Sequence, residues 1–128
     1  AADPLGVLAA LGGFDIAGMC GLMLGGAIYR IPVVLDGLIS LVAALLAQKL
    51  CPQVTDFLLP SHMGKEPACA MAMEKLGLEA SIYGNLALGE GTGAVMLFPL
   101  LDMAEAVYRE NSTFEEIHVG AYQEFKEE

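Results

Sequence analysis

The chain has 128 residues, of which 55% are apolar and 15 are glycine, and its formal net charge is −10 at pH 7. This length suits one domain that buries about two thirds of its unfolded surface. The charge argues against a nucleic-acid partner, because polyanions are bound by clustered Lys and Arg, and the six basic residues here stand singly. Any phosphate site would therefore depend on backbone amides.

The first half of the chain predicts three helices and one strand. The predicted elements are a helix over 5–11, a helix over 16–29, a buried strand over 31–35 and a helix over 38–50. Asp3 followed by Pro4 has the pattern of an N-cap and a first helical residue, and Asp15 is predicted to cap the second helix. The β-branched strand ends at Asp36, and Pro52 ends the third helix.

The second half continues the alternation of strands and helices. The predicted elements are a strand over 56–60, a helix over 66–76 with Gly77 just past its end, a weak strand over 79–83 and a long helix over 94–108. Such alternation predicts an α/β fold with a parallel sheet. Ligands of open parallel sheets bind at the carboxyl ends of the strands, so we expect Asp36, His62 and Glu90 along one edge.

The last part of the chain is acidic. From Asp102 onward it carries eight of the sixteen acidic residues, with few large apolar residues after Phe114. We therefore predict a domain over 1–114 and a solvated acidic tail over 115–128.

Two apolar runs, over 16–28 and 33–47, raise the alternative of a small membrane protein. Neither run reaches the roughly 18 to 20 residues free of charge or breakers that a spanning helix needs. Pro32 and Asp36 interrupt the combined run, and a charge at the centre of a bilayer costs at least about 2.5 kcal/mol. We expect no membrane span.

The cysteines are odd in number and lack a CxxC spacing. Cys20, Cys51 and Cys69 stand in apolar surroundings, which is typical of buried thiols in a reducing compartment and predicts a cytoplasmic location. His62 and His118 are too few and too far apart to suggest a metal site. We expect no metal and no cofactor.

The segment 88–94 is the strongest candidate for chemistry, since it holds Glu90 between glycines just before an apolar helical run. Glycines permit positive φ and a close approach of backbone to ligand. One interpretation is a carboxylate presented as a base. The other is an acid that complements the helix dipole, which is worth roughly 0.3 to 1 kcal/mol.

Four collinear segments, over 12–19, 31–37, 61–62 and 88–94, resemble the C-terminal part of the nicotinate-nucleotide–dimethylbenzimidazole phosphoribosyltransferase family of cobalamin lower-ligand assembly. The resemblance implies a Rossmann-like three-layer fold with parallel strands, here as a C-terminal fragment of a larger enzyme. It also implies phosphoribosyl transfer from nicotinate mononucleotide to 5,6-dimethylbenzimidazole, giving α-ribazole 5′-phosphate and nicotinate. The family is usually a homodimer, and we expect the isolated fragment to be inactive.

By this resemblance Glu90 matches the general base that takes the ring N–H proton of the benzimidazole. The implied substrate-binding residues are Asp36, Gly37, Ser61, Leu88, Gly89, Gly91 and Gly93. Two of the acids have competing explanations from the residues alone: Asp36 as a cap of the helix that follows Gly37, and Asp15 as a cap, which we prefer for it. The alternative function is a non-catalytic Rossmann-like nucleotide-binding or structural domain, although the loop reads GxGxG rather than GxGxxG.

Overall fold

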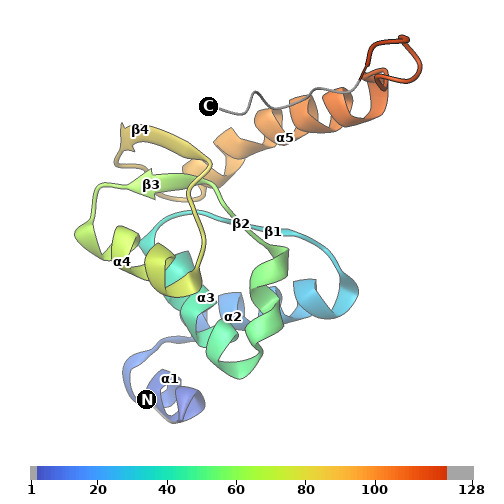
Figure 1. The fold of residues 1–128 in the computed structure, drawn as a ribbon. Coiled ribbons are helices and arrows are strands. Elements are labelled where there is room, and N and C mark those ends of the chain that lie inside the picture. Colours follow the sequence, from blue (N-terminus) through green and yellow to red (C-terminus); the bar gives the residue numbers. More distant parts are fainter. Residues whose placement is uncertain (1–2, 121–128) are drawn as a thin grey trace, which may run out of the picture. The chain divides into compact units, whose positions relative to one another are not determined.

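The computed structural model describes residues 3–120, and its contacts divide it into two compact units, with the boundary between Phe98 and Pro99. The first unit holds α1 (Pro4–Leu11), α2 (Phe14–Tyr29), β1 (Val33–Leu35), α3 (Leu38–Leu50), the 3₁₀ helix η1 (Pro52–Phe57), β2 (Leu58–Pro60), β3 (His62–Gly64), α4 (Pro67–Leu76) and β4 (Ile82–Leu86). The last helix, α5 (Thr92–Glu110), runs across the boundary between the units. Figure 1 gives the order of these elements.

The strands form two parallel pairs. The strand β1 pairs with β2 from Val33↔Leu58 to Leu35↔Pro60. The strand β3 pairs with β4, with a shift of register between His62 and Gly64. Only Ser61 separates β2 from β3, so adjacent segments of the chain pair with β1 in one sheet and with β4 in the other. The predicted α/β class with parallel strands is confirmed.

All three predicted strands differ from the structure in their bounds, and β3 was not predicted. The strand predicted over 31–35 begins only at Val33, because Ile31 N donates to Gly26 O at the end of α2 and Pro32 has no N–H. Asp56 belongs to η1, because Pro52 starts a 3₁₀ turn that ends only at Phe57. The strand predicted over 79–83 begins at Ile82 and continues through Gly84 and Asn85, which are weak strand formers.

The first helix begins as predicted. The Asp3 carboxylate accepts a hydrogen bond from Gly6 N at 2.9 Å. The cap predicted for α2 is wrong: Gly13 is the N-cap, and Asp15 lies inside the first turn. An acid in that turn complements the helix dipole almost as well as a cap does, so the local pattern did not separate the two.

The third and fourth helices have the predicted ends. Gly37 is the N-cap of α3 without a side-chain cap hydrogen bond, and Gly77 ends α4 with φ 69°. That left-handed conformation is one that glycine adopts without steric cost.

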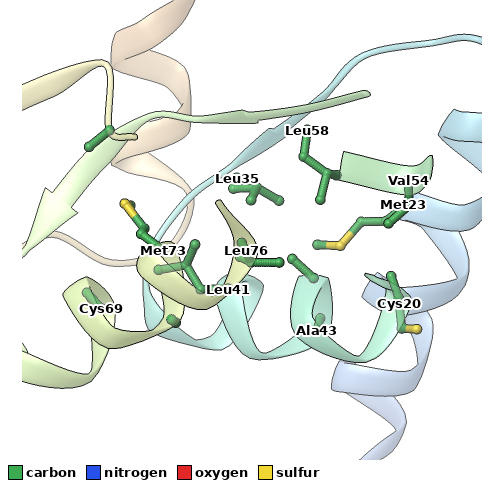
Figure 2. Packing of buried hydrophobic residues seen from close by; sticks show 14 residues of the cluster. Cys20, Met23, Leu35, Leu41, Ala43, Val54, Leu58, Cys69, Met73 and Leu76 are labelled. Atoms are coloured by element: carbon green, nitrogen blue, oxygen red, sulfur yellow. The ribbon is translucent and has the colours of Figure 1, made fainter. Parts of the chain in front are cut away.

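The core of the first unit lies between the strands and the helices α2, α3 and α4 (Figure 2). Leu35 of β1 and Leu58 of β2 point toward helix residues that include Leu41 and Leu76 (Figure 2). Because a buried Leu contributes roughly 1.5 to 3 kcal/mol, this cluster fixes the strand ends on which the candidate site stands.

The cysteines are only partly core residues. Cys20 and Cys69 are buried, and burial raises the pKa of both thiols above the usual range. Cys51 is half-buried at the C-terminal end of α3, where its thiol donates to Gln53 Oε1 at 3.4 Å. The prediction of a core position was wrong for Cys51, because the chain turns outward at Pro52.

The second unit contains the rest of α5 and an exposed turn over 114–118. In α5 the Arg109 and Glu105 side chains form an exposed ion pair one helical turn apart. Of the predicted tail over 115–128, the structure describes residues 115–120, all of which are exposed, and 121–128 lie outside the described residues.

Over residues 3–120, no helix is both long enough and apolar enough to cross a membrane.

Candidate functional site

The glycine-rich segment before α5 forms a tight turn that carries Glu90. Thr92 N donates to Gly89 O at 3.1 Å, and the two central residues have positive φ, 57° at Glu90 and 80° at Gly91. Positive φ at both central residues is the signature of a type I′ turn, which favours Gly, Asn and Asp. Glutamate in the left-handed region is strained, by about 1 to 2 kcal/mol relative to the right-handed form.

The Asp36 carboxylate holds this turn from the end of β1. Its Oδ2 accepts from Gly91 N at 3.2 Å, and its Oδ1 accepts from Ala94 N at 3.0 Å. Ala94 lies in the first turn of α5 and Gly91 directly precedes the helix, where backbone N–H groups otherwise lack partners. The interpretation of Asp36 as a cap of the helix that follows Gly37 is wrong, because α3 has no side-chain cap hydrogen bond. Asp36 instead caps the start of α5.

Gly93 packs directly against a buried histidine. A Cβ added at Gly93 would overlap His62 Nδ1 and would lie 2.9 Å from Asp36 Oδ1. His62 is 1% exposed, and Ser61 Oγ lies 3.0 Å from its Nδ1. The start of α5 thus approaches the strand ends so closely that only glycine fits at this position.

An open cavity of about 680 Å³ lies beside the turn. Its volume falls in the range of roughly 300 to 1,000 Å³ that is typical of small-molecule sites. Four carboxylate residues line it, namely Asp15, Asp36, Glu66 and Glu90, and none of the described lining residues is Lys or Arg.

The structure brings together most of the predicted site residues. The cavity lining includes six of them, namely Asp36, Gly37, Leu88, Gly89, Glu90 and Gly91. Ser61 and Gly93 do not line it: Ser61 is fully buried and Gly93 is packed under the turn. All of these residues belong to the first unit.

Sequence reasoning missed two of the lining carboxylates. Glu66, the N-cap residue of α4, had no motif to mark it. Asp15 stands in one of the segments that carry the resemblance, but the preferred interpretation was a helix cap, so it was left out of the predicted site. The expectation that the ends of parallel strands lie together is the signal that could have pointed to these carboxylates. Local sequence patterns, however, do not determine which strands pair.

Within the part of the chain that the structure describes, no group of three or more His, Cys, Asp or Glu side chains is arranged to hold a metal ion.

Comparisons with known proteins agree on one family. A family model described as phosphoribosyltransferase matches residues 1–119. The nicotinate-nucleotide–dimethylbenzimidazole phosphoribosyltransferase of Clostridium acetobutylicum is 49% identical over 124 residues, which are 97% of this chain and 35% of that relative. The enzyme of the same name from Acetivibrio thermocellus is 45% identical over 94% of this chain and 34% of its own length.

Solved structures lead to the same family. The crystal structure of CobT from Thermus thermophilus matches 91% of this chain and 35% of its own chain, with a TM-score of 0.84 and 40% identity. The chain thus spans about a third of the length of the relatives that it matches. Because the family model covers nearly the whole sequence, this chain belongs to the phosphoribosyltransferase family, which confirms the resemblance seen in its motifs.

Proposed function

We propose that this chain supplies the acceptor-activating part of an enzyme that transfers phosphoribose from nicotinate mononucleotide to 5,6-dimethylbenzimidazole. The products are α-ribazole 5′-phosphate and nicotinate. The observation that carries the proposal is the Glu90 carboxylate, exposed on a strained turn at the edge of the cavity. Strained conformations of this kind cluster at functional sites.

Glu90 acts as the general base. One ring nitrogen of the benzimidazole attacks the anomeric carbon of the ribose while Glu90 takes the proton from the other ring nitrogen. The bond from the anomeric carbon to the pyridinium nitrogen breaks, and its electron pair leaves with nicotinate, so the anomeric centre inverts. Removal of the proton as the new bond forms prevents positive charge from building up on the azole, and such general-base help typically contributes about 10² to 10⁴ in rate.

The charge of the cavity supports an azole in it and disfavours a phosphate. Asp15, Glu66 and Glu90 line it without a described Lys or Arg among the lining residues. An anionic phosphate would be repelled there, whereas an azole that donates an N–H would be attracted. We therefore assign the phosphate of nicotinate mononucleotide to another part of the enzyme. The same charge disfavours the alternative of a nucleotide-binding domain.

The remaining predicted residues receive different roles in this proposal. Leu88 is half-buried at the cavity and supplies an apolar wall for the aromatic ring, and Gly89 brings backbone close to it. The Gly91 amide already donates to Asp36, and Gly93 and Ser61 are buried, so we assign these three to support of the turn. Asp36 and Gly37 directly follow β1 and line the cavity.

The complete enzyme is proposed to be a cytoplasmic homodimer that acts without metal or cofactor. Because this chain spans about a third of its relatives, we expect it to be inactive alone. Loss of the groups that position the second substrate removes orders of magnitude in rate.

The test is Glu90→Gln in a phosphoribosyltransferase of full family length that carries these residues. We expect kcat for α-ribazole 5′-phosphate formation to fall by about 10² to 10⁴, with azole binding retained, because the amide keeps the shape of the side chain but does not accept the proton. Glu79→Gln, an exposed acid that does not line the cavity, is the matched control. Unchanged kcat in Glu90→Gln would remove the base from the mechanism.

A further inference from the structure

The start of α5 is attached to two separate strand ends. Asp36, directly after β1, accepts from Gly91 N and Ala94 N, which lie 55 and 58 residues later in the sequence. His62, the first residue of β3, lies under Gly93. The turn that carries Glu90 is therefore positioned by contacts that reach across the first unit, and neither contact comes from its own neighbours in the sequence.

The contact with Asp36 is of the stronger kind. A carboxylate that accepts from backbone N–H groups at a helix N-terminus combines a charge-assisted hydrogen bond with the helix dipole. Asp36 is half-buried, which limits competition from water. The Gly91 amide that it binds directly follows Glu90, so the bond fixes the peptide on which the left-handed turn depends.

The contact with His62 restricts the same helix start from below. The imidazole is almost fully buried, and the Ser61 hydroxyl at 3.0 Å from Nδ1 fixes the ring plane. Gly93 is also buried, with no room for a Cβ between it and this ring. The start of α5 therefore has little freedom to move. Asp36 holds it through the Gly91 and Ala94 amides, and His62 blocks it at Gly93.

We propose that Asp36 is a positioning residue that acts on phosphoribosyl transfer through Glu90, by holding the Gly89–Thr92 turn in its left-handed form. Asp36 itself does not need to touch a substrate, because both of its carboxylate oxygens are bound to the start of α5. This inference rests on the proposed function of Glu90. Its consequence is that Asp36 matters for turnover only while Glu90 is there to be positioned.

A double-mutant cycle tests this dependence in the full-length enzyme. Asp36→Asn should lower kcat about 10- to 100-fold with the azole KM changed less than about threefold, because the amide places an N–H against the Gly91 N–H. In the Glu90→Gln background the same change should lower kcat less than about twofold. Equal losses in both backgrounds would overturn the proposal, since they would indicate direct substrate contact or general destabilisation. Asp56→Asn, at an exposed acid of η1, is the control.

A second readout keeps the positioning claim separate from the catalytic one. In Asp36→Asn, hydrogen exchange at the Gly91 and Ala94 amides should speed up at least about tenfold, while the Leu78 amide, which donates to Met73 O, should keep its rate. Unchanged exchange at Gly91 and Ala94 would refute the tether. If Glu90→Gln leaves kcat unchanged while Asp36→Asn still speeds up exchange at Gly91 and Ala94, the proposed function of Glu90 is wrong. The conclusion that Asp36 holds the turn is then still supported. Asp36→Ser, which keeps one neutral acceptor, replaces Asp36→Asn if that enzyme does not fold.

Discussion

Glu90 combines a strained backbone with an exposed carboxylate at the cavity. A left-handed glutamate costs free energy that a glycine at the same position would not. Nothing in the packing of the turn requires the carboxylate, since the hydrogen bonds that hold it come from Gly91 N, Ala94 N and Thr92 N. The conflict between backbone and side chain supports the proposed role of Glu90 as a base.

Glu90→Gly should stabilise the chain while lowering kcat of the complete enzyme by about 10² to 10⁴. Relief of the left-handed strain, less the added flexibility of the unfolded chain, predicts a free energy of unfolding higher by roughly 0.5 to 1 kcal/mol. Glu74→Gly, at an exposed position inside α4, should instead lower it by about 1 kcal/mol. Urea unfolding of the two variants measures both values. A change of the same sign in both variants would show that the Glu90 backbone is not strained.

The helix α2 shows how element packing depends on individual glycines. A Cβ added at Gly26 would lie 2.6 Å from Val33 Cγ2 and 2.8 Å from Ile31 O, whereas one added at Gly21 has nothing within 4 Å. The close approach at Gly26 lets the chain fold back from α2 into β1. Both glycines lie inside the same helix and look alike in the sequence.

Gly→Ala at these two positions should therefore have opposite effects. Gly21→Ala should raise the free energy of unfolding by roughly 0.5 to 1 kcal/mol, because alanine is the better helix former. Gly26→Ala should lower it by about 1 to 3 kcal/mol, because the added methyl group overpacks the contact with β1. Thermal or urea unfolding of this chain decides the matter, and stabilisation by Gly26→Ala would show that the contact is looser than described.

Local signals predicted the elements well where one residue type has one physical role. Asp3-Pro4 and Gly77 mark helix ends because few other conformations suit them, and both predictions were confirmed. The cap predicted at Asp15 is wrong because an acid just before a helix and an acid in its first turn both complement the helix dipole, so the local pattern does not separate them. The role of Asp36 as a cap of α5 had no local signal at all, since its partners lie 55 and 58 residues away.

At the scale of the whole molecule, the cavity supplies only part of what the reaction needs. It offers carboxylates and an apolar wall beside the turn, and no described basic side chain for a phosphate. The chain spans about a third of its relatives, so the phosphate-binding groups are expected in the rest of the enzyme. We therefore propose that this chain activates the azole acceptor and that the rest of the enzyme binds the phosphate of the donor.

If Glu90 removes a proton from the azole, its substitution should affect only acceptors that have a proton to lose, and two acceptors can be compared in the full-length enzyme. Benzimidazole has an N–H to lose, whereas 1-methylbenzimidazole attacks through its other nitrogen with no proton to remove. Glu90→Gln should lower kcat/KM by about 10² to 10⁴ with benzimidazole and by less than about threefold with 1-methylbenzimidazole. Equal losses with both acceptors would contradict this prediction, because Glu90 would then act by packing or binding and not as a base.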